Sequence, residues 1–295
     1  VLRKQRSISF LRRHWKMEFP STGSRWRPRT LDSDMYSSWS SLWIIFVCVL
    51  SLVLVATGCG GGAAILTADP TGTPLFDQGQ DALVEEDWND AIAAFDTLLR
   101  NYPSSPYLAE ARLGIGRAYY EQGRVDSLIL AVDAFQGFLT YHPSHKFVDY
   151  AQYMVGMTYV KQMRTPDRDQ APTRRAIDAM DQFLENYPDS SLHASVVEER
   201  RKAIDSLAAH ELQVARWQAS RDEDWDAAID RVNFALESFP ETTLKCDLLF
   251  TMGDAYKEAA QFENAVLYYR RVTNEYPDCA LVEDAQERIQ EINGG

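Results

Sequence analysis

Few residues in this 295-residue chain have the types and spacing that catalysis requires. Metal-binding helices typically present two ligands four residues apart, and no pair of histidines in the chain has that spacing. The histidines beyond residue 58 are His142, His145, His193 and His210. Nucleophile elbows, phosphate-binding loops and dinucleotide fingerprints are also absent from the sequence. We therefore expect no enzymatic activity, no metal and no cofactor.

Cys59 has the setting for a covalent modification. It follows the uncharged, mostly apolar segment 40–58, whose last residues Ala56-Thr57-Gly58 resemble the bacterial lipobox. That motif implies removal of residues 1–58 as a leader and acylation of Cys59. A retained transmembrane helix is the alternative, because about 20 apolar residues span a bilayer. Met17 is a candidate translation start, and the Gly- and Thr-rich segment 59–74 is predicted to be a flexible tether.

The charge of the chain excludes one class of partner. The whole chain has 30 Lys/Arg and 43 Asp/Glu, and residues 1–58 hold nine and three of these, which leaves 21 against 40, or about −19. Nucleic-acid binding depends on cationic neutralisation of phosphates, so we expect no nucleic-acid partner. Anionic headgroups are repelled by the same surface, and the lipid on Cys59 would have to provide the membrane attachment.

Segment 76–103 is the unit from which the rest of the chain is built. Apolar residues three and four apart predict a helix on each side of a turn at Asp87 and Asn89, and Pro103 ends the second helix. Small and large residues fall at the places of the 34-residue tetratricopeptide (TPR) pattern, in which two antiparallel helices pack closely. These residues are Gly79, Trp88, Ala91, Phe95, Leu98 and Pro103.

Four further copies of this unit follow. Each is marked by the proline that ends its second helix, at Pro143, Pro188, Pro240 and Pro277. The sequence therefore predicts an all-α TPR superhelix of five helical hairpins, with a capping helix over 281–292. We assign repeats one to three to residues 75–188, and repeats four and five with the cap to 189–295. A long helical pattern from Leu192 to about Ser220 separates the two parts, and its charged residues 198–202 read as a solvated face.

Two features within the repeats leave alternatives open. The polar loop 164–172 is either a solvated turn or a protruding contact loop. Cys246 and Cys279 begin successive helical patterns, where axes about 8–10 Å apart exceed the reach of a disulfide without adjustment. We favour two unpaired buried cysteines over a bridge.

The first helices of TPR hairpins line the concave face, and this placement gives a candidate peptide-binding groove. Its predicted members are Phe76, Gln80 and Leu83 in repeat one, Leu113, Arg117 and Tyr120 in repeat two, and Tyr153, Met157 and Lys161 in repeat three. The alternative is that they pack against adjoining helices. Arg231, in repeat four, is predicted either to pair with a partner's carboxylate or to form an internal pair near Asp224 or Asp230.

The lipobox, the tether and the five repeats together resemble the BamD family, the lipoprotein D subunit of the β-barrel assembly machinery. The segment FLTYHPSHKFVDYAQYMVGMTYVKQM, followed by DRDQAPTRRAIDAMDQFLENYPDSSLHASV, carries the most specific match. The resemblance implies a lipid-anchored scaffold on the periplasmic face of the outer membrane. N-terminal repeats would bind unfolded outer-membrane proteins, and C-terminal repeats would hold the barrel-bearing, BamA-like subunit through its periplasmic domains. Arg231 matches the family's Arg-Val pair that faces that subunit.

Two other readings of the repeats remain open. One is a cell-envelope TPR protein associated with Tol and Pal, and the other is an anchored adaptor for a peptidoglycan enzyme or for pilus assembly. Affinity purification from membranes separates them, because each reading predicts a different companion protein.

Overall fold

The computed structural model describes residues 69–221 and 224–294. The predicted leader 1–58, the predicted acylation site Cys59 and most of the predicted tether lie outside these residues. The helices of the described part are α3 Thr73–Glu85, α4 Trp88–Asn101, α5 Leu108–Gln122, α6 Val125–Tyr141, α7 Val148–Gln162, α8 Ala171–Asn186, α9 His193–Arg221, α10 Trp225–Ser238, α11 Lys245–Glu258, α12 Phe262–Glu275 and α13 Val282–Gly294.

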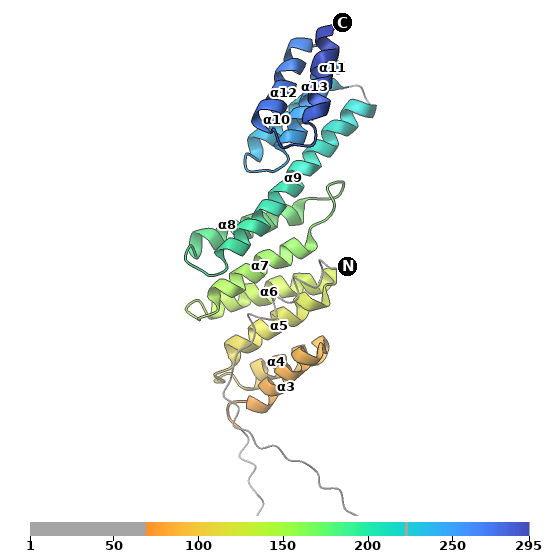
Figure 1. Cartoon of the computed structure of the whole chain (residues 1–295). Coiled ribbons are helices and arrows are strands. Elements are labelled where there is room, and N and C mark those ends of the chain that lie inside the picture. The colour runs from red at the N-terminus through yellow and green to blue at the C-terminus, as the bar shows by residue number, and fades with distance from the viewer. Residues whose placement is uncertain (1–68, 222–223, 295) are drawn as a thin grey trace, which may run out of the picture. The chain divides into compact units, whose positions relative to one another are not determined.

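These helices form the predicted all-α TPR array. Successive helices pair as five hairpins, from α3–α4 to α11–α12, and α13 packs on α12 as the cap (Figure 1). Second helices send one large side chain into the core, such as Phe95 in α4, Phe135 in α6 and Tyr269 in α12, each fully buried. Glycines on the first helices make room for these rings, which is why small residues mark the repeat.

The array begins earlier in the sequence than predicted. A carboxylate oxygen of Asp69 accepts a hydrogen bond from the Thr71 amide at 2.9 Å, and its other oxygen accepts from the Thr73 amide at 2.9 Å. The Ser105 hydroxyl also donates to the Thr71 carbonyl at 2.5 Å. Residues 69–74, which the sequence assigned to the tether, therefore form the entry to α3 and its first turn.

Helix α9 joins the first three repeats to the last two. It has the predicted length, 29 residues, and packs on α7 and α8 as well as on α10 and α11. Arg200 reaches both sides, because its guanidinium contacts Asp181 of α8 and Glu241 of the α10–α11 loop, each at 2.5 Å. Asp205 holds the same loop through the hydroxyl of Thr242 at 2.8 Å.

The expectation of two unpaired cysteines is wrong. Cys246 and Cys279 form a disulfide, and their Cα atoms are 6.6 Å apart. The prediction placed both residues on helices, at the distance between two axes. Cys279 instead lies in the connection between α12 and α13, which approaches the first turn of α11 and brings the two thiols within bonding distance.

Over the described ranges 69–221 and 224–294, none of the helices combines the length and the apolar content needed to cross a bilayer.

Candidate functional site

Several of the predicted groove residues belong to the apolar cores of their repeats. Phe76 is 5% exposed, and its ring stacks on that of Tyr107 with centroids 4.5 Å apart. Leu83 on α3 and Leu113 on α5 are also buried. Gln80 is half-buried, and its Nε2 lacks a hydrogen-bond partner among the described residues. These side chains mainly pack the repeats, so the candidate binding surface lies further along the chain.

Helices α5 and α7 bring the other predicted residues together. Lys161 Nζ donates to the carbonyl oxygen of Tyr120 at 2.6 Å and lies 4.0 Å from the centroid of the Tyr120 ring. Tyr120 and Tyr153 are 8% and 7% exposed and belong to the apolar core that repeats two and three share, whereas Arg117 and Met157 are half-buried. Residues three or four apart share one face of a helix, so these side chains form one surface across the two helices.

Glu199 of α9 adds a carboxylate to this surface. Burial raises the pKa of Tyr153 to about 12, and the negative charge of Glu199 adds to this effect. The pKa of Tyr120 is raised as well, first by burial and then by the charge of Glu121. Both phenols therefore stay neutral hydrogen-bond donors. Burial lowers the pKa of Lys161, while Glu121 opposes that shift.

The chemistry of this surface is that of binding. Aromatic rings stack on apolar side chains, neutral phenols donate hydrogen bonds, and the ammonium and carboxylate groups offer both signs of charge. Over the ranges 69–221 and 224–294, no group of three or more His, Cys, Asp or Glu is placed to hold a metal ion. The sequence missed Glu199, because its pair with Lys202 at 2.8 Å looks like an ordinary solvated helix pair.

Arg231 is held by an internal carboxylate. Its Nη1 donates to Oε2 of Glu211 on α9 at 3.1 Å, where Glu211 is 5% exposed. The predicted internal partners, Asp224 and the neighbours of Asp230, were therefore the wrong residues, because α10 packs along the second half of α9. The Arg231 side chain is still 41% exposed. Guanidinium donors beyond the one used by Glu211 can face a second carboxylate.

Gln170 is a second residue that sequence reasoning missed. It is 2% exposed at the end of the α7–α8 loop. Its Nε2 donates to the carbonyl oxygens of Thr165 and Arg168, both at 3.0 Å. Its Oε1 accepts from the hydroxyls of Thr173 at 2.8 Å and Ser206 at 3.4 Å. The buried amide of Gln170 thus holds the loop by hydrogen bonds and connects it to α9. The loop is therefore fixed on the array and is not a free solvated turn.

Comparison with known proteins identifies the family. A family model described as "YfiO: Outer membrane lipoprotein" matches residues 68–266. The chain belongs to the BamD (YfiO) family. Relatives named outer membrane protein assembly factor BamD include those of Caulobacter vibrioides, 28% identical over 75% of this chain and 74% of the relative, and Vibrio cholerae, 28% identical over 68% and 86%. The BamD of Xylella fastidiosa is 25% identical over 70% of this chain and 74% of the length of that relative.

Membership of the BamD family confirms the resemblance and gives the chain a role in outer-membrane protein assembly. Solved structures similar to this BamD-family chain include the yeast Sti1 TPR2AB domain, with a TM-score of 0.42 and 12% identity over 75% of this chain and 83% of that one. The crystal structure of MamA has a TM-score of 0.33 and 18% identity over 69% and 90%.

Proposed function

We propose that this chain is a lipid-anchored scaffold on the periplasmic face of the outer membrane. Acylated Cys59 attaches it to the membrane. Repeats one to three bind unfolded outer-membrane proteins, and repeats four and five hold the barrel-bearing, BamA-like subunit of the assembly complex. The names of the curated relatives support the role in assembly, and the surface formed by α5, α7 and α9 supports binding as the chemistry.

The meeting of Tyr120, Tyr153, Lys161 and Glu199 on consecutive first helices carries this proposal. An unfolded outer-membrane strand alternates apolar and polar side chains. Rings and methylene stems on this surface fit the apolar side chains, and the phenols and charges can bond the exposed backbone and polar side chains. Such contacts tolerate many sequences, as a protein that receives different substrates requires.

Arg231 is proposed as the contact with the BamA-like subunit. Glu211 fixes the guanidinium from one side, so less rotamer entropy is lost when a partner carboxylate binds its exposed side. Arg231→Glu should abolish co-purification of the barrel-bearing subunit with the lipidated chain. Glu211→Gln tests the support, and we expect a smaller loss because the guanidinium remains present but less fixed.

Peptide binding tests the groove. The full lipidated chain in detergent is titrated with a fluorescent peptide whose sequence is the C-terminal strand of an outer-membrane β-barrel protein. Lys161→Glu should raise the dissociation constant about tenfold, which equals about 1.4 kcal/mol. Lys146→Glu makes the same charge change at an exposed site on the α6–α7 connection and should leave the constant unchanged. Equal binding by wild type, Lys161→Glu and Tyr153→Ser, all shown to be folded, contradicts the groove.

The anchor and the partners have their own tests. Cys59→Ser should abolish incorporation of radiolabelled palmitate and release the chain from membranes. Affinity purification of the wild-type chain should recover a β-barrel protein with repeated periplasmic domains. Recovery of Pal, of a murein hydrolase or of a pilus component without that barrel protein would instead favour one of the other cell-envelope adaptors.

A further inference from the structure

Two neighbouring pockets on one edge of the array carry opposite charges. The first, the acidic edge pocket, has a volume of about 430 Å³ between the α3–α4 and α5–α6 turns. The second, the basic edge pocket, has a volume of about 530 Å³ between the α5–α6 turn and the α7–α8 loop. Both volumes are large enough to hold side chains of a bound segment. The pockets flank the same turn, so one extended segment can reach both.

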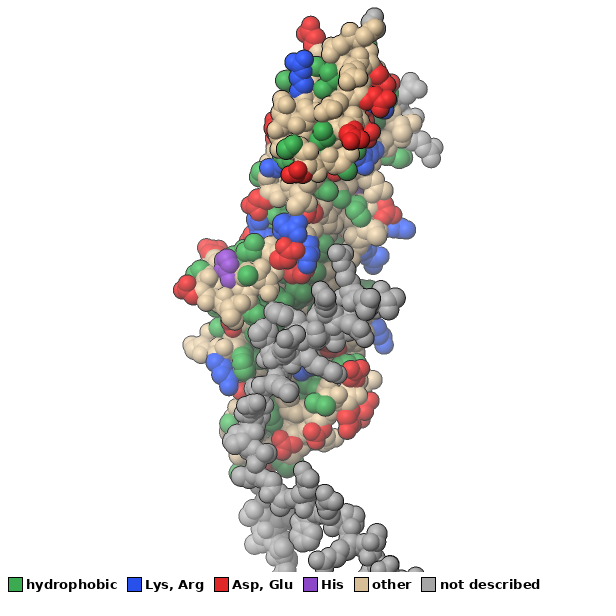
Figure 2. All heavy atoms as spheres, viewed as in Figure 1, with side chains coloured by type: hydrophobic (Ala, Val, Ile, Leu, Met, Phe, Trp, Pro, Cys, Tyr) green, Lys and Arg blue, Asp and Glu red, His purple; other side chains and the backbone are tan. Residues whose placement is uncertain are grey.

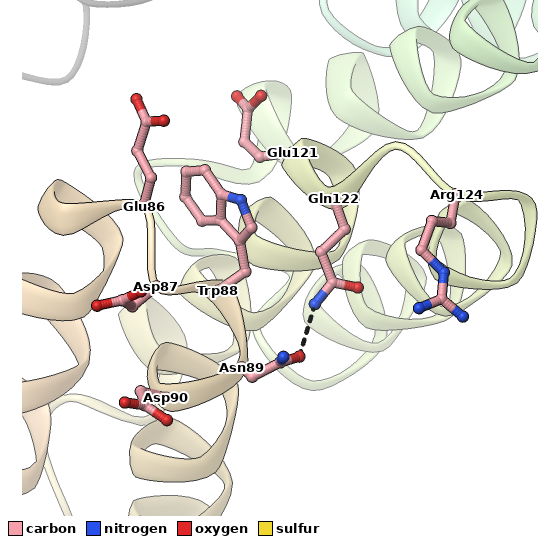
Figure 3. Close-up of a pocket in the computed structure, with 8 residues that line it drawn as sticks. All are labelled: Glu86, Asp87, Trp88, Asn89, Asp90, Glu121, Gln122 and Arg124. Carbon is pink, nitrogen blue, oxygen red and sulfur yellow. Dashed lines mark hydrogen bonds between the residues drawn. The ribbon is translucent and has the colours of Figure 1, made fainter.

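The acidic edge pocket has four carboxylates and one guanidinium around an indole ring. They are Glu86, Asp87, Asp90 and Glu121, with Arg124 and Trp88. Glu86 and Glu121 flank the ring of Trp88, and Arg124 lies apart, beyond Gln122 (Figure 3). Carboxylates also gather over the α3–α4 end of the array (Figure 2). Arg124 pairs with Asp126 at 2.6 Å, and the four carboxylates outnumber the single guanidinium, so the pocket carries a net negative charge.

Glu86 has a left-handed backbone conformation, which Ala260 after α11 shares, and it places a carboxylate at the acidic edge pocket. Glu86 caps α3 with φ of 65°, in the left-handed region that side chains other than glycine rarely adopt. At the equivalent place in repeat two, Gly123 caps α5 with φ of 68°. Repeat one therefore keeps a strained glutamate where the next repeat has an unstrained glycine, and that glutamate faces the acidic edge pocket.

The basic edge pocket is held in shape by the buried Gln170. Its charged members are Lys161, Arg164 and Arg168 against Asp169. Arg164 and Arg168 are exposed on the α7–α8 loop that the Gln170 amide organises. His210 Nδ1 is also hydrogen-bonded to the Pro166 carbonyl oxygen at 2.5 Å, which fixes the loop on α9 a second time. Both guanidinium groups are exposed on this loop, where that of Arg168 also contacts Asp167 at 3.3 Å.

An apolar strip adjoins the basic edge pocket. Val125 lines it and is 63% exposed, and Ile129, one helical turn further along α6, is 55% exposed. Leu128 beside them is buried and forms part of the floor. Exposed aliphatic side chains next to a fixed cationic loop are typical of an interaction surface rather than of a solvated face.

We propose that this edge is a docking site for an extended segment of a partner protein with opposite charges at its two ends. Basic side chains of the segment occupy the acidic edge pocket, and acidic side chains contact Arg164 and Arg168. An aliphatic residue packs on Val125 and Ile129. The charge order of the two pockets fixes the direction of the segment along the edge. The site shares Lys161 with the proposed groove for unfolded proteins. The residues that test it, Val125, Asn89, Glu86, Arg164 and Arg168, are not members of that groove.

Site-specific photo-cross-linking in cells tests the proposal. A photoreactive amino acid replaces Val125 in one full-length chain and Asn89, which lines the acidic edge pocket, in another. Mass spectrometry then identifies the cross-linked peptide. We expect both positions to cross-link to one partner segment, with acidic residues at the attachment point of Val125 and basic residues at that of Asn89.

Charge variants sharpen the test. Arg164→Glu with Arg168→Glu should lower the yield of the Val125 cross-link at least fivefold. Arg175→Glu with Arg270→Glu makes the same charge change at exposed residues outside both pockets and should leave the yield unchanged. Glu86→Gly should lower the Asn89 cross-link yield while raising the thermal midpoint of unfolding, because it removes charge and backbone strain together.

Three outcomes overturn the proposal. One is that both positions give no cross-link above the background of a chain without the photoreactive residue. Another is that they cross-link to segments without the expected charges, or to residues 1–68 of this chain. The third is that the charge reversals on the loop leave the cross-link yield unchanged. Peptide binding to the groove can succeed or fail in each case, so the two proposals are judged separately.

Discussion

The packing of Phe95 gives a sharp prediction on the stability of the array. This ring, fully buried, is enclosed by Gly79 of α3 on one side and Gly114 of α5 on the other. A Cβ added at Gly79 would lie 2.5 Å from a ring atom, and one at Gly114 would lie 2.4 Å from another. Ordinary contacts between carbon atoms are about 3.5–4.0 Å, so either methyl group would force the ring or the helices apart.

Two opposing effects determine how much Gly114→Ala changes the free energy of unfolding. Alanine is better than glycine in a helix by about 1 kcal/mol. Overpacking a tight core costs about 1–3 kcal/mol, and an overlap of about 1 Å with a rigid ring belongs in the upper part of that range. We expect a net loss of about 1–2 kcal/mol. For a domain of this size the midpoint of thermal unfolding should fall by roughly 2–8 °C.

Gly137 supplies the matched control. It also lies within a helix, α6, but a Cβ there meets nothing within 4 Å. Gly137→Ala should therefore raise stability by roughly 0.5–1 kcal/mol. Thermal unfolding followed by far-ultraviolet circular dichroism compares the two variants. Combining Gly114→Ala with Phe95→Leu should cost less than the sum of the single changes, because the smaller side chain leaves room for the methyl group. If Gly114→Ala raised the midpoint as Gly137→Ala does, or if the two changes were additive, the packing argument would be refuted.

Three further predictions concern other contacts. Reduction of Cys246–Cys279, which closes a separation of 33 residues, should lower the free energy of unfolding by about 3–4 kcal/mol on the chain-entropy model, measured by urea titration with and without reductant. Asp205→Ala should cost about 1–3 kcal/mol, because the hydroxyl of Thr242, a residue 4% exposed, loses its acceptor; Asp205→Asn, which keeps an oxygen, should cost less in the same assay. Burial lowers the pKa of His142 below its usual 6.5, so only the unfolded chain takes up this proton as the pH falls through that value. The stability that His142 contributes is therefore complete above about pH 6.5 and is lost below it. His142→Phe should make the melting temperature fall less steeply between pH 7 and pH 5. An unchanged slope would contradict this role of His142.

The repeats could be predicted from sequence because the same pattern of small, large and helix-ending residues packs each helical hairpin. A small residue on the first helix, a large one on the second and a proline after it recur in each unit, so one hairpin predicts the next even though the prolines are 40, 45, 52 and 37 residues apart. The disulfide of Cys279 could not be predicted in this way, because Cys279 lies in the connection between α12 and α13. Its distance from Cys246 depends on the path of that connection. Periodicity describes positions on helices and carries little information about where a loop runs.

The residues missed by sequence reasoning share a second property. Glu199 and Gln170 act between hairpins, and Glu211 acts between the two helices of one hairpin. Glu199 makes an ordinary pair with Lys202 and also affects the phenol of Tyr153 on α7. A charged residue within a run of charged residues on one helix looks solvent-exposed in the sequence. The sequence does not show that a neighbouring helix lies close to it. Only the packing of helices, within a hairpin for Glu211 and between hairpins for Glu199 and Gln170, assigns these side chains their partners.

Helix α9 connects the two surfaces that the proposed function requires. The charge of Glu199 raises the pKa of Tyr153 on α7, and Glu211 on the same helix holds Arg231. The two glutamates are twelve positions apart, which corresponds to about 18 Å along a continuous helix at 1.5 Å per residue. A helix without an internal proline or glycine bends little over that distance, so it acts as a spacer between the two sites. Arg200 and Asp205 lie between the glutamates and bond the α10–α11 loop. Packed and hydrogen-bonded structure rather than a flexible linker therefore joins Arg231 to the proposed groove.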